Sequence, residues 1–285
     1  MTTQAGAAVA TAAAQPPHPK KVRARRNWGD GVLRLVAGLV LLFLFLPIFV
    51  IILFSFNKPL GKFNYAWQGF TFENWADPFK YPALTDALLL SLNVAAVSTA
   101  IALVLGTLVA IALVRQRWRG HRAVDTFLIL PLTAPEVVIG AALLTLFLDF
   151  GWAAGYTTIL IAHIAFEVSF IAMTVRARVR GFDWTLEDAS LDLGAGPART
   201  FFRVTLPLIV PGIVAAAMLS FALSLDDFII TYFVSGSTVT YPLYVNAAVK
   251  AAVPPQINVL ATAILGASLL LLAVGTLWRR KRFEG

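Results

Sequence analysis

The sequence predicts an all-α membrane protein with six transmembrane helices. Hydrophobic residues make up 59% of the 285 residues and charged residues only 13%, about half the charged fraction of an average globular domain. Six apolar runs are long enough to cross a hydrocarbon core, which takes roughly 20 residues. The net charge of +8 lies in short clusters at the ends of these runs, which indicates membrane topology rather than nucleic-acid binding.

Several kinds of chemistry are excluded by composition. The chain has no cysteine and three histidines, which rules out disulfides and thiolate catalysis and leaves little room for a metal site. No nucleophile, base and oxyanion constellation is visible, and the phosphate-binding pattern GxxxxGK[ST] is missing. We therefore expect neither an enzyme nor a resident cofactor or metal.

The N-terminal region, residues 1–30, is rich in Ala, Thr and Pro and then basic, and we expect a disordered cytoplasmic tail. A cleaved signal peptide is the alternative. However, the apolar run that follows, residues 33–56, is longer than the apolar part of a signal peptide and lacks a small-x-small cleavage site. We expect it to remain as the first helix, with Pro47 tolerated inside it. Residues 31–285 then form a single transmembrane domain.

The other five runs follow in order along the chain. They cover residues 88–114, 124–148, 154–175, 208–234 and 257–278. With the N-terminus in the cytoplasm, 19 of the 23 Lys and Arg residues fall in cytoplasmic segments, as the positive-inside rule requires. Both termini are therefore predicted to be cytoplasmic, and the arginines at 115–122 to face anionic lipid.

Two external loops follow from this topology. The first, residues 57–87, is rich in aromatic side chains, which are typical of the membrane interface. Trp67 is the exception we single out, because an indole face at an entrance can hold an ammonium group through a cation–π contact. The second, residues 235–256, contains several Gly and Pro residues and is predicted to be a structured cap that can receive a soluble partner.

The cytoplasmic loop at 183–212 has a structure of its own. Thr185 and Asp188 fit a capping box, which predicts that a short helix begins at Thr185. That helix should stop at Gly194, and Pro197 suits the first position of a second short helix. Two short helices meeting at a glycine would present a knob to a cytoplasmic partner.

The same loop resembles the EAA loop of the integral membrane subunits of ABC importers. Asp188-Ala189-Ser190, three residues, Gly194, nine residues and Val204-Thr205-Leu206-Pro207 match the family pattern Glu-Ala-Ala-x3-Gly-x9-Ile-x-Leu-Pro, with Asp, Ser and Val as mild replacements. In that family the loop inserts into a groove of a separate ATP-hydrolysing subunit. The resemblance implies these coupling residues: Glu187, Asp188, Ala189, Asp192, Gly194, Ala195, Leu206 and Pro207. Asp188 can alternatively serve only as a helix cap.

Further patches resemble the second permease subunit of spermidine/putrescine importers. They include Trp67–Thr71, Pro135–Val137, Ser224–Asp227 and Asn258–Thr262. The resemblance implies a permease in the bacterial inner membrane that works with two ATPase copies, a second permease in a heterodimer, and an external binding protein. It also implies a polyamine cargo, although importers of other solutes can share these patches.

Acidic residues inside the predicted spans point independently to a cationic cargo. There are four of them: Glu136, Glu167, Asp226 and Asp227. An Asp at the centre of a membrane helix costs about 2.5 to 3.5 kcal/mol on insertion scales, so each acid is a functional candidate. No Lys or Arg in the same spans neutralises them. A polyamine, with ammonium groups along an apolar chain, would match carboxylates interleaved with aromatic rings.

Helical spacing indicates which of these acids can line a transport pathway. Ser224 and Asp227 fall on one stripe of the fifth helix, whereas Asp226 is rotated by about 100°. We therefore expect Asp227 to line a pathway and Asp226 to pair or to lie at its edge, although small polar residues can also mediate helix packing. Glu136, after Pro135, is the third pathway candidate.

Glu167 is expected to pair with His163 one helical turn before it, with substrate contact as the alternative. The substrate-pathway set is thus Asp227, Asp226, Glu136, Ser224, Trp67 and Glu167. A rival hypothesis is an ion-coupled transporter that uses Glu136, Glu167 and Asp227 as a proton relay. That class would favour inverted internal repeats, of which the sequence shows no convincing trace.

Overall fold

The computed structural model describes residues 28–116 and 118–283, with side chains described over 31–116 and 118–270. Almost all of the tail expected at 1–30 lies outside the described residues. The chain divides into two compact units, residues 1–50 and 51–285, with the boundary inside helix α1 (Trp28–Ser55). Helix α1 continues through Pro47 without a break, as expected for the first apolar run.

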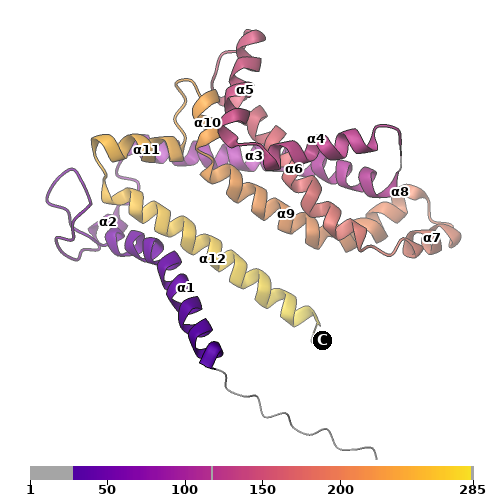
Figure 1. Ribbon diagram of the computed structural model, residues 1–285, viewed down its shortest axis with the longest axis horizontal. Helices are drawn as coiled ribbons and strands as arrows, with labels where there is room; N and C mark the ends of the chain where they lie inside the picture. Colours follow the sequence, from indigo (N-terminus) through magenta and orange to yellow (C-terminus); the bar gives the residue numbers. More distant parts are fainter. Residues whose placement is uncertain (1–27, 117, 284–285) are drawn as a thin grey trace, which may run out of the picture. The chain divides into compact units, whose positions relative to one another are not determined.

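The unit at 51–285 is helical, and the described residues contain isolated bridges but no strand (Figure 1). Its helices are α2 (Glu73–Ala76), α3 (Pro82–Arg115), α4 (His121–Thr133), α5 (Glu136–Asp149), α6 (Tyr156–Arg180), α7 (Thr185–Asp192), α8 (Pro197–Thr200), α9 (Leu206–Asp226), α10 (Ile229–Val234), α11 (Tyr241–Ala251) and α12 (Pro255–Phe283), with a π-helical turn over Phe201–Thr205.

Among the described residues, four helices are long and apolar enough to cross a membrane, or five if α4 and α5 count as one span. Helices α4 and α5 meet at an angle of 112°, so the run expected to form one helix over 124–148 forms two. The break falls at Ala134, whose ψ of 143° is extended, because the ring of a following proline disfavours the helical conformation of the residue before it.

The fifth predicted helix is also interrupted. Helix α9 ends at Asp226, and Asp227 has an extended backbone with φ −62° and ψ 119°. The Asp227 Oδ2 atom accepts hydrogen bonds from the backbone N–H of Thr231 at 2.8 Å and from its hydroxyl at 2.7 Å. A short carboxylate that satisfies a free N–H at a helix start favours a break over a continuous helix.

Helices α3, α6 and α9 form the centre of this unit. Their buried contact residues are mostly small or branched: Ala102, Ala110, Ile171, Val175, Val179, Ile209 and Ala216. At Gly106, an added Cβ would lie 2.7 Å from the Cγ2 atom of Ile171, so only glycine allows this approach of α3 to α6. Close packing through small residues is how helices associate where water supplies no driving force.

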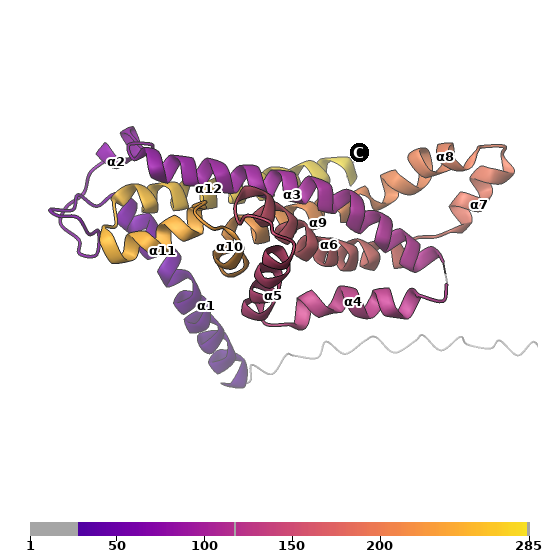
Figure 2. The ribbon, with the colours of Figure 1, turned by 90° about the horizontal axis from the view of Figure 1, so that it is seen from above.

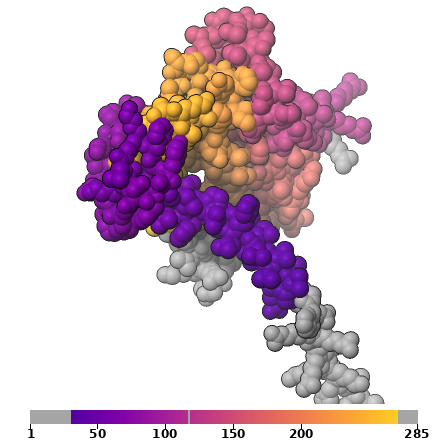
Figure 3. All heavy atoms as spheres, turned by 60° about the vertical axis from the view of Figure 1, so that its left-hand side comes forward, coloured from indigo at the N-terminus to yellow at the C-terminus, as the bar shows by residue number. Residues whose placement is uncertain are grey.

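The two predicted docking regions lie at opposite ends of the 51–285 unit. Helices α7 and α8 lie at one end, and α2, α11 and the loop at 57–81 lie at the other (Figures 1 and 2). The segment after α1 forms a compact mass in the space-filling view (Figure 3). Inside it, the ring of Phe56 stacks on Phe70 and on Trp75, each with ring centroids 5.5 Å apart.

The segment predicted to be the second external loop is structured, as expected, because it contains helix α11. Its helix α11 is tied to α3 by a hydrogen bond from the Tyr241 backbone N–H to the hydroxyl of Ser91 at 2.8 Å. The Tyr241 hydroxyl donates to the carbonyl of Ile257 in α12 at 3.2 Å. Burial raises the pKa of Tyr241 to about 12, so this phenol stays a donor at neutral pH.

Candidate functional site

The first part of the candidate site is the loop at 183–206, where α7 begins differently from the prediction. The Asp183 Oδ1 atom accepts hydrogen bonds from the Thr185 backbone N–H at 3.1 Å and from its hydroxyl at 2.8 Å. The capping box of Thr185 with Asp188 is therefore wrong, and Thr185 is the first helical residue. Asp183 performs the capping because its carboxylate, two residues before Thr185, accepts the N–H that the first turn leaves free.

The predicted end of this helix is confirmed at Gly194, whose φ is +85°. The Gly194 N–H donates to the carbonyl of Leu191 at 2.9 Å, and the Ala195 N–H donates to that of Ser190 at 3.1 Å. This pair of bonds is a Schellman motif, which needs a left-handed residue at Gly194. The second short helix begins at Pro197 as predicted and passes through the π-helical turn into α9.

The predicted coupling residues separate into an outer and an inner group. The residues Asp188, Ala189, Asp192, Gly194 and Pro207 are exposed, and Ala195 and Leu206 are half-buried. Glu187 is buried, with 5% of its side chain accessible. Helices α7 and α8, which we call the knob, therefore hold most of the motif residues at the protein surface, while Glu187 points into the protein.

Glu187 joins three elements. Its Oε2 atom lies 3.1 Å from Nη2 of Arg115, at the end of α3. Its Oε1 atom accepts a hydrogen bond from Thr205, just before α9. The Arg115 guanidinium also lies 5.7 Å from the ring centre of Trp184. This cluster, which we call the Glu187 clamp, fixes α7 to the ends of α3 and α9.

The second part is a buried polar cluster between α3, α6, α9 and α10. The Ser98 hydroxyl donates to Glu167 Oε1 at 2.9 Å and lies 3.2 Å from the Ser224 hydroxyl. The Nδ1 atom of His163 lies 2.7 Å from the Ser224 hydroxyl, and Nε2 lies 2.9 Å from the Thr231 hydroxyl. We call these residues, with Asp227, the carboxylate cluster.

The structure thus brings together three predicted pathway residues, Glu167, Ser224 and Asp227. The expected pair of His163 with Glu167 is wrong: His163 Nε2 lies 3.4 Å from Asp227 Oδ2 instead. Asp227, at the break after Asp226, contacts the same histidine of α6 as Ser224 does. Sequence reasoning missed Ser98, which is one small residue in a long apolar helix.

The remaining pathway residues do not belong to the carboxylate cluster. Asp226 is exposed at the end of α9, and Glu136 is exposed in the first turn of α5. Trp67 is 44% exposed, and its ring meets Phe54 edge-on at 6.3 Å. Their roles in a pathway stay predictions.

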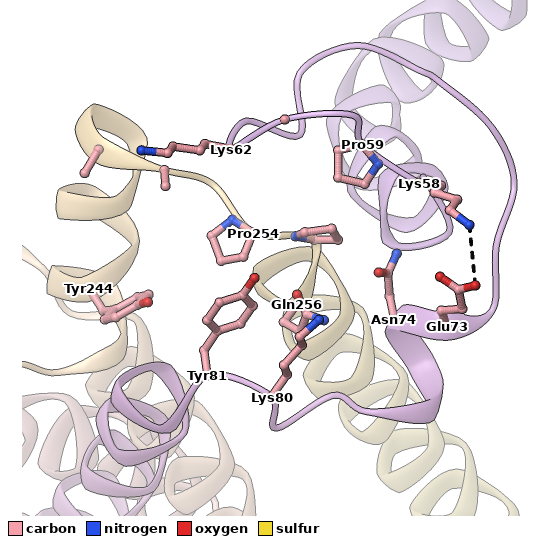
Figure 4. Close-up of a pocket in the computed structure, with 14 residues that line it drawn as sticks. Lys58, Pro59, Lys62, Glu73, Asn74, Lys80, Tyr81, Tyr244, Pro254 and Gln256 are labelled. Atoms are coloured by element: carbon pink, nitrogen blue, oxygen red, sulfur yellow. Dashed lines mark hydrogen bonds and ion pairs between the residues drawn. The ribbon is translucent and has the colours of Figure 1, made fainter.

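A separate pocket of about 590 Å³ opens between the loop at 57–81 and the residues around the start of α12 (Figure 4). Lys58, Lys62 and Lys80 line it, together with Tyr81 and Gln256 at the starts of α3 and α12. Lys58 pairs with Glu73 at 3.5 Å. Three ammonium groups beside two helix N-termini make this pocket electropositive, so it does not suit a polycation.

The chain was compared with known families and structures. Residues 102–281 match the family described as binding-protein-dependent transport system inner membrane component. The putrescine transport system permease protein PotI of Escherichia coli (strain K12) is 39% identical over 233 residues, which cover 79% of this chain and 82% of PotI. The spermidine/putrescine transport system permease protein PotC of Haemophilus influenzae is 35% identical over 240 residues, 84% of this chain and 93% of PotC.

Solved structures share the fold at lower identity. A bacterial ABC transporter involved in the import of the acidic polysaccharide alginate has a TM-score of 0.68 and 17% identity over 90% of this chain and 96% of its own. The MetNI methionine ABC transporter in an inward-facing conformation has a TM-score of 0.58 and 18% identity over 70% of this chain and 95% of its own.

Proposed function

This chain belongs to the family of binding-protein-dependent transport system inner membrane components and is a transport permease, and we propose that its cargo is a polyamine. The observation that carries the proposal is the identity of 39% over 79% of the chain to a putrescine permease. The carboxylate cluster supports it, because buried acids in a membrane segment suit a cation.

In the proposed assembly the permease lies in the bacterial inner membrane with six spans and both termini in the cytoplasm. Helix α12 would be the sixth span. Two separate ATPase subunits would hydrolyse ATP, a second permease would complete a heterodimer, and an external binding protein would deliver cargo. The placement of the knob and of the external loops at opposite ends of the 51–285 unit supports this division.

Alternating access would proceed through α9. The helix has 21 residues, about 32 Å at 1.5 Å per residue, and runs from the coupling loop to Asp226. When ATP draws the two ATPase subunits together, the knob would move with them. The Glu187 clamp would pass that movement to α3, which carries Ser98, and to α9, which carries Ser224 and is followed by Asp227.

Uptake by the complete importer in proteoliposomes tests the proposal. We expect ATP-dependent accumulation of radiolabelled putrescine or spermidine, unaffected by excess amino acids or divalent metal ions. Accumulation of another solute with no polyamine uptake would overturn the polyamine cargo. Accumulation driven by a proton gradient without ATP would instead support the ion-coupled transporter.

A further inference from the structure

The pocket between the loop at 57–81 and the start of α12 gathers positive charge. The segments predicted to be external contain only four lysines and no arginine. Three of these, Lys58, Lys62 and Lys80, line this one pocket, and Figure 4 shows them on different sides of it. Because the positive-inside rule disfavours lysine in external segments, their convergence at one pocket indicates a negatively charged ligand.

The lining residues include one carboxylate. Glu73 lies 3.5 Å from Lys58, and the two side chains are 73% and 61% exposed, so this pair holds Lys58 only weakly. Lys62 and Lys80 form no ion pair with any residue that the structure describes. Three lysines and one glutamate give the lining a net charge of +2, and the N-termini of α3 and α12 add to it.

Hydrogen bonds hold the walls of the pocket in place. The Val253 N–H donates to the carbonyl of Lys62 at 2.9 Å, and the Asn64 N–H donates to the carbonyl of Val253 at 3.2 Å. Within the loop, the Asn74 side-chain amide donates to the carbonyl of Asn57 at 2.8 Å. The loop is therefore fixed to the segment that precedes α12, and the pocket between them is already formed.

The proposed topology places the pocket at the depth of lipid headgroups. Gln256, which lines the pocket, directly precedes the predicted sixth span, and Lys58 lies two positions after the first. The headgroup region extends about 5 to 8 Å beyond each side of the hydrocarbon core. Residues this close to the ends of the spans lie within that region.

Exposed apolar side chains adjoin the pocket lysines. Leu60 is 87% exposed and Phe63 is 43% exposed, and they lie on either side of Lys62 in the chain. Phe79, which directly precedes Lys80, is 57% exposed. A soluble anion gains nothing from such side chains, whereas a phospholipid presents phosphate beside apolar chains into which they can insert. The apolar neighbours and the depth therefore both favour a lipid.

We propose that this pocket binds the phosphate headgroup of an anionic phospholipid, which is neutralised by the ammonium groups of Lys62 and Lys80. Lys58 joins them when it leaves Glu73. The volume of about 590 Å³ is in the usual range for organic ligands, about 300 to 1,000 Å³. The proposal rests on the topology given under the proposed function but not on the polyamine cargo.

Photocrosslinking of the complete importer tests the lipid site. The importer is placed in nanodiscs of phosphatidylcholine with a trace of phosphatidylglycerol that carries a diazirine on its headgroup, and crosslinked peptides are identified by mass spectrometry. We expect adducts in residues 58–63 and 251–256, which excess phosphatidylglycerol suppresses and excess phosphatidylcholine does not. Adducts in the predicted cytoplasmic segments serve as the internal standard.

Three variants, all at exposed side chains, make the test specific. The double variant Lys62→Gln, Lys80→Gln should lower the pocket adducts at least about 10-fold, since each lysine beside a phosphate contributes about 5-fold, or about 1 kcal/mol. Lys250→Gln removes the fourth predicted external lysine, which does not line the pocket, and should change nothing. Glu73→Gln frees Lys58 and should raise the yield.

Three outcomes would overturn the lipid site. Equal pocket adducts in the double variant and the unaltered importer would show that the lysines hold no headgroup. Suppression by millimolar inorganic phosphate would assign the pocket to a soluble anion. Absence of pocket adducts would also overturn the proposal. If the double variant then also lost the stimulation of ATP hydrolysis by the external binding protein, the pocket would be assigned to an acidic protein surface.

Failure of the proposed topology is distinct from failure of the lipid site. The chain has no cysteine, so a cysteine introduced at Ala251, an exposed residue of the pocket lining, can be labelled specifically. If the pocket is external, an impermeant thiol reagent labels this cysteine in intact spheroplasts. Labelling only after the membrane is opened would contradict the topology, whereas the crosslinking result stands by itself.

Discussion

Glu187 and Glu167 are two buried glutamates with opposite surroundings. Each accepts a hydrogen bond from a hydroxyl, from Thr205 and from Ser98 respectively. Glu187 also has a guanidinium at 3.1 Å, whereas the second oxygen of Glu167 has no partner among the described residues. Burial of a charge is costly unless the charge is paired. The glutamate with a charged partner therefore stabilises the fold, whereas Glu167 is buried without a charged partner among the described residues.

The largest expected effect is on uptake, and it comes from a substitution in the coupling loop at 183–206. Gly194→Arg forces a side chain into a left-handed conformation, which costs about 1 to 2 kcal/mol, and it places bulk on the knob. We expect polyamine uptake to fall more than about 10-fold while the protein still inserts in the membrane. Uptake and insertion are measured in the same vesicles.

The matched control is Gly196→Ala. Gly196 is exposed in the same loop, has a φ of −71° and has no atom within 4 Å of an added Cβ, so uptake should be unchanged. Normal uptake in Gly194→Arg would show that the knob does not couple transport.

Breaking the Glu187 clamp should lower stability. Glu187→Gln removes the charge that Arg115 and Thr205 share, and we expect a loss of about 1 to 3 kcal/mol in the free energy of unfolding. The half-exposed Arg115 favours the lower part of this range. Glu73→Gln, which breaks the exposed pair with Lys58, should cost less than about 1 kcal/mol. Equal losses in the two variants would contradict an internal role for Glu187.

Glu167→Gln should not lower the free energy of unfolding as Glu187→Gln does. It replaces a buried carboxyl group that has no basic partner at close range with a neutral amide of the same shape, and we expect stability to be unchanged or to rise by about 1 kcal/mol. A loss as large as that of Glu187→Gln would show that the charge of Glu167 is stabilised in the folded protein as well as that of Glu187. Parallel unfolding curves of the two variants decide this.

The smallest expected effect on stability is that of Ala189→Cys. Ala189 is an exposed small residue of α7, so the thiol should leave stability within about 0.5 kcal/mol of the unaltered protein. We expect it to crosslink to a cysteine in the groove of the ATPase subunit. A cysteine at Asn93, in α3 outside the coupling loop, should give no such product. No crosslink at Ala189 would argue against docking of the knob.

Local patterns in the sequence predicted much of this protein. Gly194 and Pro197 predicted the end of one short helix and the start of the next, because backbone conformations of Gly and Pro depend on little beyond the residues themselves. Apolar runs predicted the helices, and the motif spacing predicted the family. Two breaks were missed, and both lie beside the acids Glu136 and Asp227.

The tertiary structure decided the partners of the charged groups. Residues 98, 163 and 227 meet only because α3, α6 and α10 pack together, and no spacing along the chain encodes that meeting. The sequence by itself determined a helical transport permease, because membrane burial and chain conformation leave local patterns. Only packing decided that Glu187 is paired with Arg115 while Glu167 Oε2 has no hydrogen-bond partner in the described part of the chain, since the energy of a buried charge depends on the groups within a few ångströms of it.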